Sequence, residues 1–276
     1  MTEHEFKRIT GYMARNYGID LSKKRIIVEG RLDNYIASKG YKDYESYMDA
    51  VEGSVYSEEA KNIVNILTTN HTFFLREVEH YEYLRNVILP EIKEKEALTR
   101  NLRIWSAASS TGEEPYTIAM VIKDFFGLEY QNWDTTILAT DVSSQVLGKA
   151  MEGVYQDKQI ESLPRRWVEA NFIRINESDY KIKDELKQKV LFRQFNLMNP
   201  LPFRYQLHVV FLRNVMIYFD DETKDKLVRR IVECLVPGGY LIIGMTEHID
   251  KSLYDLEYVE TSIYRKEYRK RIDYDT

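Results

Sequence analysis

The chain has 276 residues, of which 44% are hydrophobic, so it can bury a sizeable core and we expect one large domain with a smaller one. Its single cysteine, Cys234, excludes an internal disulfide framework and a cysteine-based zinc site, and its net charge of −5 argues against broad nucleic-acid binding, which needs a basic surface. No apolar run approaches the roughly 20 residues that span a bilayer, and no apolar signal core follows the charged N-terminus, so the cytoplasm is the expected compartment.

Residues 1–76 are predicted to form a small domain of four helices. Apolar residues recur at helical spacing in each, and Gly18, Gly40 and Gly53 end the first three. Ser22 is the expected cap of the second helix, and the fourth starts at Ser57. The expected buried residues are Phe6, Ile9 and Met13; Val28, Leu32, Tyr35 and Ile36; Tyr44, Tyr47, Met48 and Val51; Ile63, Val64 and Leu67.

The second helix carries the early basic residues Lys23, Lys24, Arg25 and Arg31. Such a cluster is either a solvated helix face or a docking surface for an acidic protein. The sequence leaves both interpretations open.

A polar and aromatic segment, residues 68–77, follows the helices and is expected to be a loop whose two phenylalanines, Phe73 and Phe74, plug into the next domain. Residues 77–100 then form a connector. Its helix, residues 81–96, should bury Leu84, Val87, Ile88 and Ile92 and kink at Pro90, which lacks a backbone N–H.

Residues 102–126 are predicted to be a strand, a tight loop and a helix. Thr111 and Glu114 have the spacing of a capping box, and Pro115 lies in the first turn. Small residues before a helix N-terminus let a ligand approach the backbone. Because Glu113 and Glu114 would repel a phosphate, the loop favours a cationic or zwitterionic ligand such as S-adenosylmethionine. An ordinary strand-to-helix turn is nearly as consistent with the loop alone.

Strands and helices alternate from residue 102 onward, which predicts a parallel, doubly wound sheet. A second strand, residues 136–140, ends at Asp141, which either binds ribose hydroxyls or caps the following helix. Residues 208–212 form a buried strand, and Arg213 and Asn214 follow at its carboxyl end, where doubly wound folds bind ligands.

Three short runs, residues 172–175, 180–183 and 190–193, predict an antiparallel insertion within about residues 155–195. Towards the C-terminus we expect a helix at 224–235, a turn at 237–239, a strand at 240–244, a last strand at 258–264 and a frayed tail, residues 271–276.

Five motifs, taken together and in this order, resemble the chemotaxis receptor glutamate methyltransferases (the CheR family). They are residues 69–77 (TNHTFFLRE), 105–116 (WSAASSTGEEPY), 139–143 (ATDVS), 195–197 (FNL) and 212–219 (LRNVMIYF). Five motifs in sequence are far more specific than a single small-residue loop.

The resemblance implies an α/β protein of the class I S-adenosylmethionine-dependent methyltransferase fold, Rossmann-like and doubly wound, with an N-terminal all-α domain and a small antiparallel β-subdomain insertion. The implied domains are residues 1–76, helical, and residues 101–270, catalytic. The implied partners are cytoplasmic signalling domains of chemoreceptors, with no nucleic acid, no membrane insertion and no metal, and the protein is expected to be a monomer. The family's cofactor contacts match Asn70, Thr72, Arg76, Glu113, Asp141, Asn196, Leu197, Arg213 and Asn214.

The implied reaction moves a methyl group from S-adenosylmethionine to a glutamate carboxylate, giving a glutamyl methyl ester and S-adenosylhomocysteine. Glutamate has a reference pKa of about 4.3, so the acceptor is already ionised and an in-line displacement needs no general base. Arg76 and Tyr218 are the candidates for orienting it. Their alternatives are a salt bridge from Arg76 to Glu77 or Glu79 and core packing of Tyr218.

The resemblance gives the other contacts specific roles. Glu113 would bind the methionine ammonium, Asp141 the ribose, and Asn196 with Leu197 the adenine edge. Two other functions remain open: an S-adenosylmethionine methyltransferase for RNA or a small molecule, and a non-catalytic signalling module. Glu29 and Asp33 dilute the basic face of the second helix, which argues against a receptor-docking role of Arg25 and Arg31.

Overall fold

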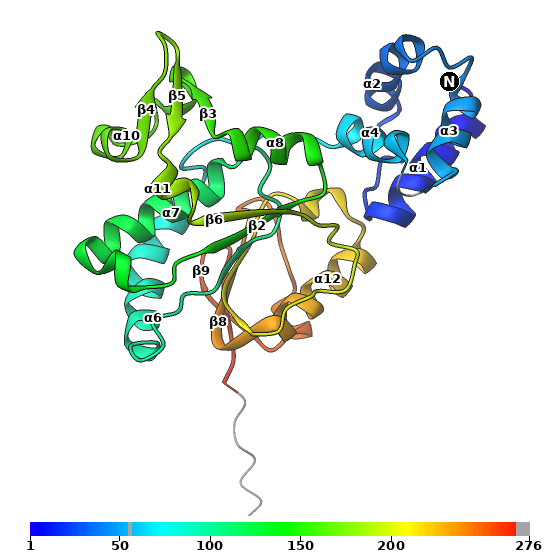
Figure 1. Ribbon diagram of the computed structural model, residues 1–276. Coiled ribbons are helices and arrows are strands. Elements are labelled where there is room, and N and C mark those ends of the chain that lie inside the picture. The colour runs from blue at the N-terminus through cyan, green and yellow to red at the C-terminus, as the bar shows by residue number, and fades with distance from the viewer. Residues whose placement is uncertain (55–56, 269–276) are drawn as a thin grey trace, which may run out of the picture.

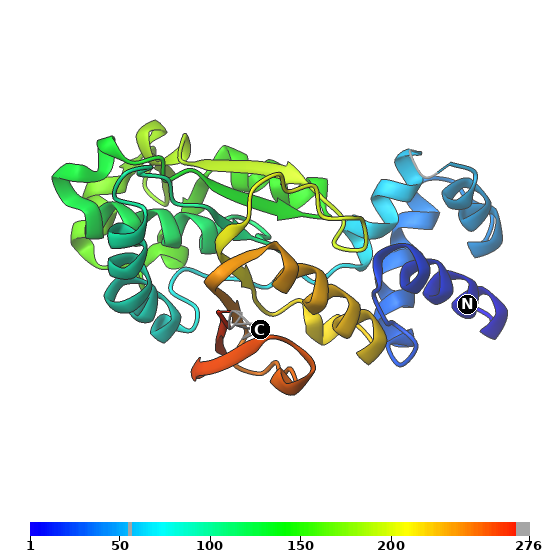
Figure 2. The same cartoon turned by 90° about the horizontal axis from the view of Figure 1, so that it is seen from below.

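The structure, a computed structural model, describes residues 1–54 and 57–268. Four helices come first and lie to one side of the sheet (Figures 1 and 2). They are α1 (Glu3–Tyr17), α2 (Arg25–Ser38), α3 (Tyr44–Glu52) and α4 (Glu58–Leu67). The predicted tail, residues 271–276, lies outside the described residues.

The predicted end of α1 at Gly18 and the predicted start of α4 at Ser57 are confirmed, and α1 also has an N-terminal cap that was not predicted. Thr2 and Glu5 form a capping box at the start of α1, and Gly18 ends it with φ 71°, a conformation that suits glycine. Ser57 caps α4 by accepting a hydrogen bond from the amide of Ala60 at 3.0 Å. The predicted cap at Ser22 is wrong, because α2 begins three residues later with no side-chain cap.

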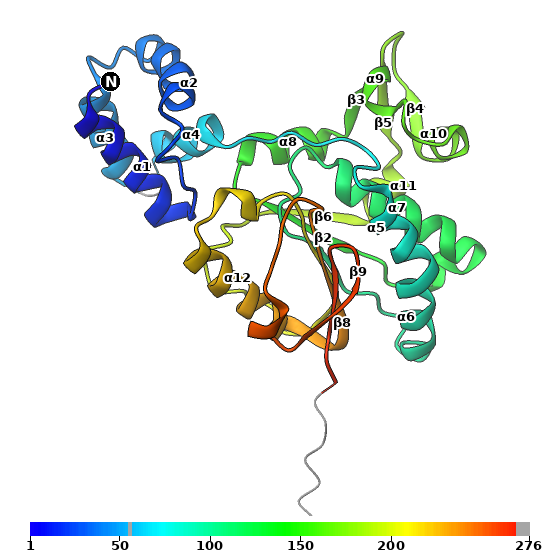
Figure 3. The ribbon, with the colours of Figure 1, turned by 180° about the vertical axis from the view of Figure 1, so that it is seen from behind.

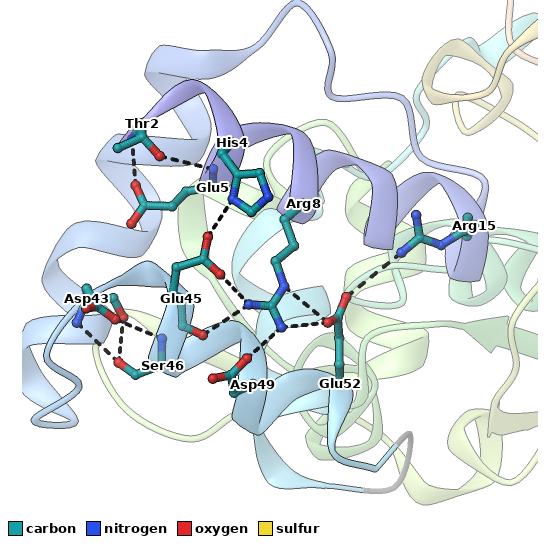
Figure 4. Close-up of polar contacts among 10 residues, drawn as sticks. All are labelled: Thr2, His4, Glu5, Arg8, Arg15, Asp43, Glu45, Ser46, Asp49 and Glu52. Carbon is teal, nitrogen blue, oxygen red and sulfur yellow. Dashed lines mark hydrogen bonds and ion pairs between the residues drawn. The ribbon is translucent and has the colours of Figure 1, made fainter.

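Arg8 of α1 holds α3 in place (Figure 4). Its guanidinium forms ion pairs with Asp49 at 2.7 Å and with Glu52 at 2.8 Å, and a third with Glu45 at 2.5 Å. Carboxylates from successive turns of α3 therefore share one cation, which fixes the angle between the two helices.

The basic cluster of α2 is partly used inside the protein. Arg31 donates to the carbonyl oxygens of Thr68 at 2.9 Å and Ile66 at 3.2 Å. Arg25 donates to Glu3 at 2.8 Å and to Glu29 at 3.1 Å. These two arginines fasten the helical part together, whereas Lys24 reaches the cleft described below.

The connector is one long helical run that changes geometry before its proline. It comprises α5 (Val78–Tyr83), a π-helical turn η1 (Leu84–Ile88) and α6 (Leu89–Lys95). Since Pro90 cannot donate a hydrogen bond and its ring crowds the preceding turn, a wider turn just before it relieves the clash. Leu84, Ile88 and Ile92 are buried as predicted, and Val87 is half-buried.

The central sheet has seven strands in the order β6-β2-β1-β7-β8-β10-β9. β1 (Ile104–Ser106), β2 (Ile137–Asp141), β6 (Val190–Gln194), β7 (Leu207–Leu212) and β8 (Leu235–Ile243) are parallel, and β10 (Ile263–Lys266) runs antiparallel between β8 and β9 (Leu256–Glu260). This strand order agrees with the doubly wound α/β sheet predicted from the sequence. Every residue of β1 and β7 is buried, because both faces of the sheet are covered.

Helices cover both faces of the sheet (Figure 3). A hydrophobic cluster lies under the helices of each face. One packs α7 (Glu113–Phe126) and the α5–α6 run against Val209 and Phe211. The other packs α12 (Asp221–Cys234) against Val210 and Leu212 and continues into the core of α1–α4. The helical part is thus attached through the α12 face.

The β-subdomain is a three-stranded antiparallel sheet of β3 (Val154–Gln156), β5 (Asp179–Ile182) and β4 (Phe172–Arg174). The run at 190–193, predicted to belong to it, is instead β6, which pairs parallel with β2 at the edge of the main sheet. The sequence of a short strand does not indicate which other strand it pairs with, and this explains why β6 was assigned to the wrong sheet. The short elements not yet named are η2 (Gly127–Asn132), α8 (Ser144–Glu152), α9 (Asp157–Ile160), α10 (Arg165–Asn171), α11 (Asp184–Lys187), η3 (Met216–Tyr218) and η4 (Lys251–Leu253).

Two predictions near the C-terminus are also wrong. Residues 237–239 do not form a turn, because β8 runs through them with a register shift against β7. Residues 258–264 are not a single strand but the hairpin of β9 and β10. In the part of the chain that the structure describes, no helix has the length and apolar character needed to cross a membrane.

Candidate functional site

A cleft opens at the carboxyl ends of β1, β2 and β7, where the strand order reverses, and the helical part closes one side of it. Its volume is about 1170 Å³ including the solvent at its mouth. All the predicted site residues except Glu113 line it: Asn70, Thr72, Arg76, Asp141, Asn196, Leu197, Arg213, Asn214 and Tyr218.

The loop after β1 is built by backbone contacts to both neighbouring strands. The amide of Ala107 donates to Phe211 O at 2.9 Å, and that of Ser109 donates to Thr140 O at 2.8 Å. Gly112 then starts α7 with φ 97°, and a Cβ there would lie 2.9 Å from both Ala150 Cβ and Tyr155 Oη. Glycine is required at this position because neither the conformation nor the space admits a side chain.

The predicted capping box between Thr111 and Glu114 does not form. Gly112 is the N-cap, and the Thr111 hydroxyl donates to Glu113 at 2.6 Å instead. Glu113 is buried away from the cleft lining, and Gln159 donates to it at 3.5 Å. Burial raises its pKa.

Glu114 is the acidic residue of this helix start that faces the cleft. Its carboxylate accepts hydrogen bonds from the Ser106 hydroxyl at 2.7 Å and from Arg213 at 2.9 Å. Burial raises its pKa, and the positive charge of Arg213 opposes the rise. Helical periodicity could not have selected it, because Thr117 and Ile118, one turn after Glu113 and Glu114, are both buried.

Asp141 ends β2 with its carboxylate buried and tied to two loops. It accepts from the backbone amides of Ser110 and Ser143, each at 2.9 Å. Burial raises its pKa, and these N–H groups oppose the rise. The alternative role as a helix cap is not found, because Ser143 caps α8 by accepting from Val146 N at 3.3 Å.

The loop after β1 and the end of β2 form one wall of the cleft, and residues 68–77 form a second wall. Asn70 O accepts from the Ser110 hydroxyl at 3.0 Å, which joins this wall to the loop after β1. Only Phe74 is buried in the next domain; Phe73 is 46% exposed and lines the cleft, so the predicted pair of plugs is half wrong.

Arg76 is half-buried in the same wall. One of its nitrogens donates to His71 O at 2.9 Å, and its guanidinium carbon lies 5.8 Å from the centre of the Phe73 ring. Within residues 1–54 and 57–268 no carboxylate forms an ion pair with it; Glu77 pairs with Arg213 at 3.0 Å instead. The sequence-based alternative of a salt bridge to Glu77 or Glu79 is therefore absent from these residues.

Arg213 and Asn214 face the cleft from the end of β7, and the side chains of both donate hydrogen bonds to Glu77. The Arg213 side chain is 2% exposed and donates to Glu77, Glu114 and Tyr81, so it braces the wall. Asn214 has φ 56°, and its side-chain NH₂ group donates to Glu77 at 3.2 Å.

The last wall joins the helical part to the loops after β6 and β7. Lys24 Nζ lies 4.9 Å from the centre of the Tyr218 ring, and Asp20 N donates to Tyr218 O at 2.8 Å. The Asn196 side chain donates to Asn16 O at 2.7 Å, and Leu197 beside it is buried. Sequence reasoning missed Lys24 as a cleft residue, since its basic cluster could equally have been a solvated face.

The donor set fits S-adenosylmethionine. The carboxylates of Glu114 and Asp141 suit its positive ammonium and hydroxyl-bearing ribose. Of the two carboxylates that the sequence set against a phosphate, only Glu114 lines the cleft.

Comparison with known proteins agrees with this chemistry. The family model described as "CheR methyltransferase, SAM binding domain" matches residues 70–265, and that described as "CheR methyltransferase, all-alpha domain" matches residues 4–68. The chemotaxis protein methyltransferase of Borreliella burgdorferi is 37% identical over 270 residues, which cover 96% of this chain and 95% of that protein. That of Escherichia coli is 34% identical, covering 90% and 85% of the two chains, and a probable one of Rhizobium etli is 33% identical, covering 84% and 88%.

Proposed function

The chain belongs to the CheR methyltransferase family, and from that premise we propose that it methylates glutamate side-chain carboxylates in the signalling domains of chemoreceptors. It is an S-adenosylmethionine-dependent methyltransferase of chemotaxis. The products would be glutamyl methyl esters and S-adenosylhomocysteine.

One observation carries the choice of acceptor: the cleft offers donors for an anion that no protein carboxylate occupies among the described residues. Arg76 has no ion-pair partner there, and Lys24 and Tyr218 lie side by side 4.9 Å apart. A free guanidinium, an ammonium and a phenol suit a carboxylate better than a neutral hydroxyl or amine.

The residues would act by placing the acceptor. S-adenosylmethionine supplies a methyl group bound to a positively charged sulfur. The guanidinium of Arg76 would hold the acceptor carboxylate by two parallel hydrogen bonds, and the Tyr218 hydroxyl would donate a third. No side chain has to remove a proton, because the acceptor is ionised near neutral pH. Esterification removes the acceptor's charge, so the same donors hold the product more weakly and release it.

Asp141 and Glu114 would serve the other ligand. Their buried carboxylates are held by hydrogen bonds from Ser110, Ser143 and Arg213. We place the ribose hydroxyls at Asp141, and we assign the ammonium to Glu114, in place of Glu113, because Glu114 lines the cleft. The adenine edge belongs to the segment of Asn196 and Leu197. We further propose that the protein works as a cytoplasmic monomer without nucleic acid.

A methyl-transfer assay tests the proposal. Radiolabelled S-adenosylmethionine is incubated with the protein and a chemoreceptor signalling domain, and the label should be base-labile and vanish when the acceptor glutamates are changed to alanine. Label that enters RNA or a small molecule instead would establish one of the alternative substrates. Binding of S-adenosylmethionine without turnover on any of these would identify a non-catalytic signalling module.

A further inference from the structure

Glu247 lies in the loop after β8, outside the motifs that point to the cofactor, yet its buried carboxylate reaches the loop after β7. Oε2 accepts hydrogen bonds from the backbone amides of Asn214 and Gly244, each at 2.8 Å, and Oε1 accepts from that of Ile217 at 3.3 Å. A single side chain therefore joins the carboxyl ends of two neighbouring strands.

The three amides are those that set the shape of the cleft wall. Asn214 has φ 56°, an uncommon conformation for a residue other than glycine, and a fixed acceptor for its N–H compensates its cost. Ile217 belongs to η3 (Met216–Tyr218), the single turn that carries Tyr218. Since η3 is too short to hold its own position, its placement depends on contacts such as this one.

The environment of Glu247 supports a positioning role. Burial raises the pKa of its carboxyl group, while the amides of Gly244, Asn214 and Ile217 oppose the rise by stabilising the ionised form. A neutral side chain would satisfy fewer of these donors, and each one left unpaired in the interior costs free energy.

We propose that Glu247 is a positioning residue for methyl transfer, which holds Asn214 and Tyr218 in place through backbone hydrogen bonds without touching either ligand. The inference rests on the proposed function in so far as Tyr218 orients the acceptor. It assigns the loop after β8 a part in the reaction that neither its sequence nor its distance from the cofactor motifs indicates.

Glu247→Gln separates the hold on Asn214 and Gly244 from the hold on Ile217, because the variant can keep the first and lose the second. The glutamine side chain has one acceptor oxygen. If this oxygen takes the Oε2 position, the hydrogen bonds from Asn214 and Gly244 remain, whereas the opposite orientation keeps only the one from Ile217. In the preferred orientation the NH₂ group faces the amide of Ile217, so two donors meet and η3 should loosen while Asn214 stays in place. The turnover number is expected to fall by roughly 10- to 100-fold, because small displacements of an orienting group cost about that much.

The experiment combines three measurements on the full chain. Hydrogen exchange should quicken at residues 215–218 and not across the protein, calorimetry should give a dissociation constant for S-adenosylhomocysteine within about twofold of the wild type, and kcat should fall with little change in KM for the receptor domain. Glu257→Gln, an exposed carboxylate on β9, is the matched control. Glu247→Asp, which keeps the charge, should recover part of the rate.

Unchanged local exchange and kcat in Glu247→Gln would overturn the proposal, and so would faster exchange throughout the protein, which marks a merely structural residue. If the wild-type protein fails to methylate the receptor domain, the proposed function fails, whereas the exchange and calorimetric results still decide whether Glu247 positions this loop.

Discussion

Glu77 and Arg213, 136 residues apart in the chain, form an ion pair with 3.0 Å between Oε2 and Nη2 inside the wall of the cleft. Their side chains are 12% and 2% exposed. Glu114 binds the other side of the guanidinium at 2.9 Å. Because a buried ion pair broken on one side leaves an uncompensated charge, this wall should respond sharply to changes of charge around it.

His80 should make the protein lose stability in mild acid. Its ring is buried beside this pair, with Nδ1 3.4 Å from Glu77 Oε2, and burial together with the charge of Arg213 lowers its pKa from 6.5 to about 4. As pH falls from 6.5 towards 4, His80 binds a proton in the unfolded chain but stays neutral in the folded protein. The free energy of unfolding should therefore drop by about 3 kcal/mol over this window. Above pH 6.5 His80 is neutral in both states and causes no loss of stability.

Denaturant unfolding of His80→Gln at pH 7 and pH 5 measures this effect. The variant should show a smaller difference between the two pH values than the wild type does. His248→Gln, an exposed histidine, serves as the control and should keep the wild-type difference. An equally steep loss of stability in His80→Gln would assign the acid sensitivity to other groups.

Arg76→Ala should bind S-adenosylhomocysteine but lose methyl transfer. Removing a donor that stabilises charge in a reacting complex typically costs about 100-fold or more in kcat. Arg76→Lys retains the charge but cannot form two parallel hydrogen bonds, so its kcat should lie between those of the wild type and Arg76→Ala. Calorimetry and the radiolabel assay measure the two properties, with the exposed Arg165→Ala as control. Full turnover in Arg76→Ala would remove Arg76 from the orienting role.

Asp141→Ala should abolish binding of S-adenosylmethionine while the protein stays folded. The same change leaves the amides of Ser110 and Ser143 without their acceptor, so the free energy of unfolding should also fall by about 1–3 kcal/mol. Calorimetry gives the first quantity and denaturant unfolding the second. Asp255→Ala, an exposed carboxylate just before β9, is the comparison. A folded Asp141→Ala that binds with wild-type affinity would refute the ribose assignment.

Gly244→Ala should displace Asn214. An added Cβ would lie 2.4 Å from Asn214 Nδ2, closer than the two atoms can approach, and 3.0 Å from its backbone N, a tight contact. Overpacking of this kind costs about 1–3 kcal/mol, and we expect cofactor affinity to fall about tenfold as the wall moves. Gly148→Ala in α8 meets no atom within 4 Å and should be neutral or stabilising in thermal unfolding. Wild-type affinity in Gly244→Ala would show that the Asn214 amide is not needed.

The sequence by itself determined the local structure and the family. Phe6, Ile9 and Met13 recur at the helical period, and Ser57 caps α4 where its spacing predicted. The runs at 102–105 and 208–212 predicted β1 and β7, which are buried throughout. These features depend on neighbouring residues only, and the five motifs are sufficient to indicate the family.

Only the tertiary structure decided how distant segments meet. It placed β6 beside β2, turned Glu114 towards the cleft and Glu113 away, and brought Glu247 to Asn214 and Ile217. Strand pairing and contacts between loops that are tens of residues apart leave no periodic pattern in either segment. Their energy comes from burying charges and N–H groups together, and that environment exists only when the whole chain has folded.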